Sequence, residues 1–129
     1  MGRGRIRSVF ANLIEGTAAS ASILCLLHCF ALPLLLLTLP AALATFALSE
    51  EVHVLLLTSV TPFALAAFWI GYQHHGHRVP AALGVAGIGC LAAGISPFPP
   101  AVQTFLTVVG SLLLFAGHLR NWRLRVHAA

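Results

Sequence analysis

Three residues in the first third of the chain combine ligand chemistry with helical spacing. Cys25, His28 and Cys29 lie within ASILCLLHCFALP, a run of otherwise apolar residues. Positions i, i+3 and i+4 share one face of an α-helix, so two sulfurs and an imidazole can point into one volume. An imidazole in hydrocarbon costs free energy unless its nitrogens are satisfied, and polar side chains at such depth usually face a bundle interior. The spacing therefore predicts a metal site.

Other chemistry fits these residues less well. Helical Cβ atoms at i and i+4 lie about 5 to 6 Å apart, whereas a disulfide requires about 3.8 Å. The C-x-x-C redox string and the C-x-x-C-H haem-attachment string are absent. The chain has no Asp, no phosphate-binding glycine loop and no Ser-His-carboxylate set, so we do not expect an enzyme or an ATP-driven pump. The simpler alternative is that the cysteines are small packing residues, on one face with Ala18 and Ser22.

The elements that must hold this face are apolar enough to lie in lipid. Of 129 residues, 59% are hydrophobic and 8% are charged, and the mean hydropathy is +0.95, which is too apolar for a soluble domain. About 20 apolar residues cross a hydrocarbon core. Four such spans can be marked out: Gly16 to Pro40, Val52 to Tyr72, Val79 to Pro97 and Ala101 to Leu119. We expect an all-α membrane protein, a four-helix transmembrane domain over 16–122 between basic segments at 1–15 and 123–129.

The arginines orient these spans. All seven basic residues fall on one side of the predicted membrane: Arg3, Arg5, Arg7, Arg78, Arg120, Arg123 and Arg125. The two connections on the other side hold Glu50 and Glu51 in one case and the uncharged ISPFPP in the other. By the positive-inside rule, both termini are expected in the cytoplasm. The net charge of +4 is then explained by topology and anionic lipid, and no nucleic-acid partner is expected.

Helix start and stop signals agree with four spans. Pro33 and Pro40 should kink or end the first span, and Ser49 should N-cap the second. The turn QHHGHRVP and the three prolines of SPFPP should separate the later spans. The segment RGRIR before an apolar run imitates a signal peptide, but the stretch from Ala18 to Ala44 is nearly twice the about 7 to 15 residues of a signal h-region. We therefore expect the first span to be retained.

Counting along the helices puts the three cysteines at one depth. At about 1.5 Å per residue from Gly16, Cys25 and Cys29 lie about 14 and 20 Å into a core of about 30 Å. Cys90, counted from Val79, lies about 17 Å deep and would join them as a further ligand if the third helix faces the first. Its alternative role is packing, because it belongs to a stripe of small residues at four-residue spacing: Ala82, Ala86, Cys90 and Gly94.

The other histidines suggest a path for the metal, and each has a structural alternative. His53, near the outer surface, either meets the entering ion or bonds to the acidic turn. His118 either contacts the ion near the inner end or caps the last carbonyls of the fourth helix. The cytoplasmic turn is either a weak capture site or a solvated loop, and it holds His74, His75 and His77. His127 lies in a tail expected to be frayed and is assigned no role.

These stretches together resemble one membrane family. They are LCLLHCFALPLLLLTLP in the first span, EEVH at the start of the second, YQHHGH in the turn and GHLRN closing the fourth. They look like the MerC family of inner-membrane mercury transport proteins, over about residues 12 to 125. The resemblance implies a multi-pass protein of the bacterial inner membrane that takes up Hg(II), with Cys25 and Cys29 as thiolate ligands. The ion would be cargo, with no permanently bound cofactor.

Two departures from the family pattern favour a borderline metal. The tail RNWRLRVHAA has none of the further cysteines of mercury-operon members, and seven histidines outnumber three cysteines. Zinc or copper transport by the same site is therefore one alternative. Another is a non-transporting metal- or haem-binding subunit or sensor that uses His28 with His118 or His53, although these histidines lie at different depths. A purely structural subunit is the third alternative.

The expected partners follow from these interpretations. They are the lipid bilayer, the metal ion and a cytoplasmic metal acceptor. Four short helices enclose little interior volume, which would favour a homo-oligomer with a shared pathway.

Overall fold

The described part of the chain is helical outside short turns. The computed structural model describes residues 2–35, 40 and 49–128, and at residues 21, 22, 25, 26 and 28–35 it describes the helix but not the side chains. The helices are α1 (Gly2–Leu35), α3 (Glu50–His75), α4 (Val79–Ala93) and α5 (Pro100–Ala128). No strand occurs among these residues, so the all-α fold class is confirmed.

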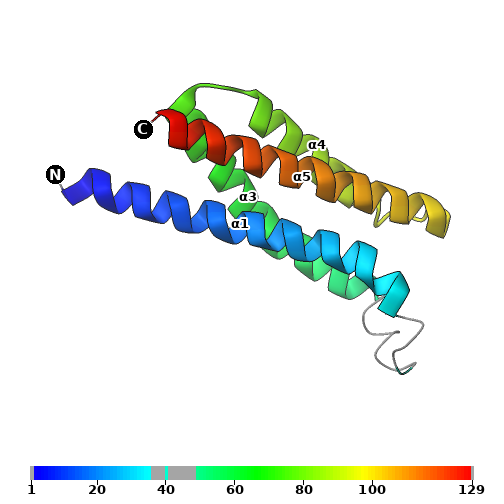
Figure 1. The fold of residues 1–129 in the computed structure, drawn as a ribbon. Helices are drawn as coiled ribbons and strands as arrows, with labels where there is room; N and C mark the ends of the chain where they lie inside the picture. Colours follow the sequence, from blue (N-terminus) through cyan, green and yellow to red (C-terminus); the bar gives the residue numbers. More distant parts are fainter. Residues whose placement is uncertain (1, 36–39, 41–48, 129) are drawn as a thin grey trace.

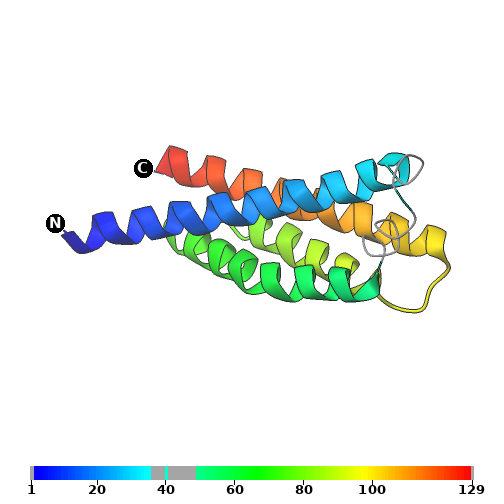
Figure 2. The same cartoon turned by 90° about the horizontal axis from the view of Figure 1, so that it is seen from below.

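The four helices form an elongated bundle in which successive helices run in opposite directions (Figures 1 and 2). Helix α1 packs against α3 and α5, and α4 packs against the same two helices, most extensively against α5. Both termini and the α3–α4 turn lie at the same end of the bundle (Figure 1). This end, called the basic end below, carries all the arginines of the chain.

Helices α3, α4 and α5 begin close to where the sequence predicts, and α3 also ends there. Ser49 is the N-cap residue of α3, although its hydroxyl makes no capping hydrogen bond. Gly76 ends α3 in the left-handed conformation, with φ 69°, and its N–H donates to the Tyr72 carbonyl. Glycine adopts this conformation without steric cost. Pro80 lies in the first turn of α4 and Pro100 begins α5, where a helix needs no N–H donor.

Helices α1 and α5 are longer than the predicted spans. Helix α1 runs from Gly2 without a break through residues 15 and 16 and past Pro33, and α5 continues to Ala128, so the tail expected to fray is helical. At about 1.5 Å per residue the two helices are about 51 and 44 Å long, longer than a hydrocarbon core of about 30 Å. Their extensions pack on each other, since Ala11 and Arg125 are buried. The basic segments are thus parts of the bundle.

The outer surface of the bundle is apolar. Helices α3 and α5 have the length and composition of membrane-crossing helices, and α4, which ends at Ala93 rather than Pro97, is a shorter apolar helix. Large apolar side chains stand on the outside, including Leu55, Val85 and Phe105 at 66%, 59% and 65% exposure. So much exposed apolar surface is typical of a protein that contacts lipid.

Glycines, rather than the predicted stripe, form the contact between α4 and α5. A Cβ at Gly87 would lie 2.7 Å from the Gly110 carbonyl oxygen, so the two backbones touch. Ala82 and Ala86 are exposed and Cys90 is half-buried. Small residues do bring the helices together, and Gly94 of the predicted stripe lies close to α5, since a Cβ there would be 2.8 Å from Thr107 Oγ1. The other three members were the wrong face, because several spacings of small residues occur on this helix. The buried residues of α4 are Pro80, Gly84 and Gly87.

The close contact between α4 and α5 predicts different effects on stability for two glycine-to-alanine substitutions in α4. Gly87→Ala should lower the free energy of unfolding by about 1 to 3 kcal/mol, the usual cost of overpacking. Gly89→Ala is the matched control, because a Cβ there meets nothing within 4 Å. It should be neutral or stabilising by up to about 1 kcal/mol, since alanine favours helix. Denaturant unfolding of both variants in detergent measures this, and equal effects would contradict the close contact.

Candidate functional site

The predicted thiol site belongs to α1. The helix continues through Cys25, His28 and Cys29, so the three positions share one helix face, as their spacing requires. Their side chains lie outside the described residues, and their role as ligands stays a prediction.

The other predicted ligands are spread along the bundle. Cys90 is a free, half-buried cysteine of α4. His53 lies in the first turn of α3, with its Nδ1 3.3 Å from the Ser49 carbonyl oxygen. Of the residues that the structure describes, no three His, Cys, Asp or Glu lie together in a group that could hold a metal ion.

The histidines of the α3–α4 turn have different environments. His74 and His77 are exposed, whereas His75 is half-buried. The His77 backbone N–H donates to His75 Nδ1 over 3.0 Å, so the proton of a neutral His75 ring is on Nε2. His75 Nε2 donates to Asn121 Oδ1 over 2.8 Å. Both nitrogens of His75 are thus engaged, and the turn is anchored to α5 rather than solvated throughout.

A cluster of buried polar side chains joins three helices at the basic end. It is called the Glu15 cluster, and its members are Glu15 of α1 and His118, Asn121 and Arg125 of α5. Their exposed fractions are 2%, 0%, 0% and 6%. Buried polar groups of this kind need partners, because each has lost its hydration.

Asn121 connects the three helices. Its Nδ2 donates to Glu15 Oε2 over 2.6 Å and to the Ala67 carbonyl of α3 over 3.2 Å. Both of these atoms are acceptors, which fixes the orientation of the amide and leaves Oδ1 to accept from His75. Gly71 of α3 makes room for the amide, since a Cβ there would overlap it.

Arg125 supplies the charge that balances Glu15. Its Nη1 lies 3.3 Å from Glu15 Oε2 and 3.4 Å from the Ala11 carbonyl oxygen, and its Nη2 donates to Asn12 Oδ1 over 2.9 Å. From the sequence, Arg125 was expected to face lipid head groups. It is instead buried between α1 and α5.

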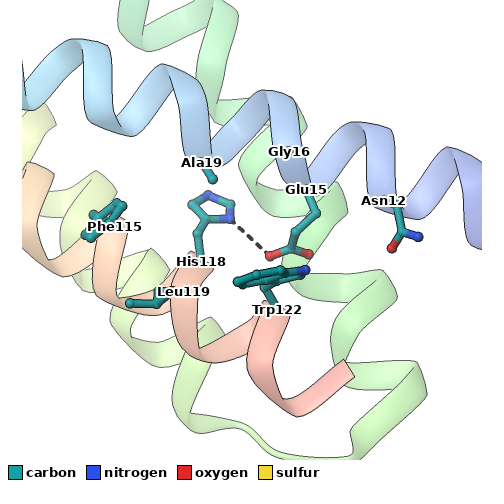
Figure 3. A pocket seen from close by; sticks show the side chains of 8 residues that line it. All are labelled: Asn12, Glu15, Gly16, Ala19, Phe115, His118, Leu119 and Trp122. Carbon is teal, nitrogen blue, oxygen red and sulfur yellow. Dashed lines mark ion pairs between the residues drawn. The ribbon is translucent and has the colours of Figure 1, made fainter. Parts of the chain in front are cut away.

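His118 is the least satisfied member of the cluster. Its ring stacks on Phe68, with centroids 4.4 Å apart, and its Nδ1 lies 3.5 Å from Glu15 Oε1 (Figure 3). Both ring nitrogens and Glu15 Oε1 are buried without a hydrogen-bond partner. The predicted capping role for His118 is wrong, because α5 continues to Ala128.

These unpaired atoms border a pocket between α1 and α5 (Figure 3). Its volume is about 230 Å³, space for several water molecules at about 30 Å³ each. Ala19, Phe115 and Leu119 give it apolar walls, and Asn12 and Trp122 also line it. Gly16 also lines it, and a Cβ there would meet nothing within 4 Å.

Sequence reasoning missed three members of the Glu15 cluster. Glu15 was assigned to the basic N-terminal segment, although it is the one acidic residue outside the turn at residues 50 and 51. His118, Asn121 and Arg125 follow one another at intervals of three and four, which puts them on one helix face. A polar stripe on α5 and a lone carboxylate on α1 were therefore available as signals.

Comparison with known proteins decides the family. A sequence profile described as MerC mercury resistance protein matches residues 15–123, most of the chain. The chain belongs to the MerC family. This makes it a membrane protein of mercury resistance and transport. None of the curated proteins or solved structures compared with this MerC protein matches it.

The buried ion pair between Glu15 and Arg125 predicts that substitutions of Arg125 and Arg123 have very different effects on the free energy of unfolding. Arg125→Met should lower the free energy of unfolding by about 3 to 5 kcal/mol, because it leaves the Glu15 carboxylate buried without its counter-ion. Adding Glu15→Gln to that variant should recover part of the loss. The control is Arg123→Met, since Arg123 is exposed and should change stability by no more than about 0.5 kcal/mol. Similar unfolding curves for Arg125→Met and Arg123→Met would contradict the burial of the pair.

Proposed function

We propose that this MerC protein is a multi-pass importer of a thiophilic metal ion in the bacterial inner membrane, with Hg(II) as its main cargo. One observation carries the proposal: the MerC profile covers a C-x-x-H-C face on one uninterrupted helix. Cys25 and Cys29 would hold the ion as thiolates, and His28 lies between them in sequence. Thiolates select soft metals and exchange them between sulfur pairs.

The proposed topology has four spans and both termini in the cytoplasm. It is supported by the placement of every arginine at the end of the bundle that holds the termini and the α3–α4 turn. Glu50, Glu51 and His53 belong to the first turn of α3, at the opposite end. In this orientation they would meet the ion as it enters.

Import of a cation needs no other energy source than the membrane potential. An inward-moving charge gains about 2.3 kcal/mol per 100 mV. The proposed route runs from the acidic start of α3 to the face of α1 that carries Cys25 and Cys29, called the thiol face. It then passes His118 and reaches the exposed histidines of the α3–α4 turn. The mixed histidine and thiolate set keeps zinc and copper as alternative cargoes of the same site.

Cellular metal accumulation tests this function. Cells expressing the intact chain should accumulate Hg above cells without it, and Cys25→Ser with Cys29→Ser should abolish that excess, because serine oxygens do not replace thiolates for a soft ion. Mass spectrometry of Hg, Zn, Cu and Cd at matched membrane levels identifies the cargo. Cys90→Ser, tested separately, measures whether Cys90 is a further ligand.

Two results would reject the proposal. One is an equal content of each of the four metals in cells that express the intact chain and in cells that express the double variant. The other is accumulation that exceeds the background but does not depend on either cysteine.

The topology has its own test. Reporter domains that are active only in the cytoplasm should be active when fused to either terminus or inserted at His77, and inactive when inserted at Phe98 between α4 and α5. Any other combination would contradict the proposed orientation, whatever the metal experiment shows.

A further inference from the structure

We infer that Glu15 and His118 form a second metal site, at the basic end of the bundle, for a divalent ion of the zinc group in transit to the cytoplasm. The inference rests on the proposed import for its direction, but the binding site itself does not depend on it. A metal site here would explain why two ligand atoms, Glu15 Oε1 and His118 Nδ1, are buried and have no hydrogen-bond partner.

The separation of these atoms suits a shared metal ion. They are 3.5 Å apart, longer than an ordinary N–H···O hydrogen bond of about 2.7 to 3.2 Å. Zinc binds imidazole nitrogen and carboxylate oxygen at about 2.0 to 2.2 Å, so two ligands on a tetrahedral ion are about 3.4 Å apart. The pair therefore already has the spacing of one edge of a zinc site.

The surrounding groups hold both ligands in this arrangement. The second carboxylate oxygen of Glu15 is fixed by Asn121 and Arg125, which leaves Oε1 as its unpaired atom. The His118 ring is fixed by its stacking on Phe68. Partners of this kind orient metal ligands and tune their affinity.

The pocket provides the remaining coordination positions. It lies against both side chains and has room for solvent or for a small ligand of the ion. A site with two protein ligands keeps open positions, as catalytic and exchanging metal sites do. An ion could therefore arrive with, or leave on, an external thiolate.

Charge makes this site weak. Arg125 already balances the carboxylate of Glu15, so a divalent ion would add uncompensated positive charge at low dielectric unless it brings an anionic ligand. Weak binding suits a site from which the ion must leave. Along α1, Glu15 lies ten residues, or about 15 Å, from Cys25 toward the basic end.

Equilibrium binding of Zn²⁺ to the full chain tests the site. We would purify the chain in detergent with Cys25, Cys29 and Cys90 replaced by Ser, and measure bound zinc by dialysis and mass spectrometry. His118→Phe in this background keeps a ring against Phe68 and removes both nitrogens. It should weaken one saturable site by at least about tenfold, since even the loss of an outer partner costs about 10- to 100-fold.

Two further variants sharpen the result. His127→Phe is the matched control, because His127 is an exposed histidine of the same helix, and it should leave the binding curve unchanged. Gly16→Val should weaken zinc binding by narrowing the pocket, because Gly16 lines it. The His118→Phe comparison repeated with all three cysteines present should give one zinc ion fewer per chain.

Equal zinc binding by His118→Phe and His127→Phe, in both cysteine backgrounds, would overturn the inference. That result would leave thiol-dependent mercury accumulation unaffected. Conversely, zinc binding that depends on His118, together with equal metal accumulation in cells with and without the chain, would reject only the proposed import.

Discussion

The burial of one carboxylate constrains the whole basic end of the bundle. A charged group taken out of water is stable only when it is paired and hydrogen-bonded, and both groups that satisfy Glu15 Oε2 come from α5. Asn121 also binds α3, through Ala67 and His75. A shift of α5 by one residue would turn its side chains by about 100° and remove them from Glu15. The cluster therefore sets the register of three helices.

Close packing makes this arrangement possible. Gly87 and Gly110 let α4 and α5 touch, and Gly71 leaves the space that the Asn121 amide occupies. Gly84 admits the ring of Phe68, which in turn supports His118. Each glycine inside a helix costs about 0.5 to 1 kcal/mol relative to alanine. The gain is a polar cluster whose members are at most 6% exposed, in which interactions are stronger than in water.

The two parts of α1 differ in ligand chemistry. The thiol face is soft, and the Glu15 cluster offers nitrogen and oxygen. In the proposed import, an ion passes from the stronger to the weaker ligands as it approaches the cytoplasm, where the potential has already favoured its movement. The proposed import also explains why the ring nitrogens of His118 make no hydrogen bond. If every polar atom of the cluster were hydrogen-bonded, none would be available to bind the ion.

The sequence by itself determined the helical class, the ends of α3 and the starts of α4 and α5, the apolar character and the family. These depend on local signals: capping glycine, prolines at first turns, runs of apolar residues and the C-x-x-H-C block. The predicted thiol site follows from spacing within one helix and is still a prediction.

Only the tertiary structure decided that Glu15 meets Asn121 and Arg125, more than a hundred residues away. It also showed that glycines, not the alanine stripe, form the α4–α5 contact, and that α1 and α5 continue into the basic segments. The physical reason is that helical periodicity tells which residues share a face, whereas the neighbour that this face meets depends on the packing of all four helices at once.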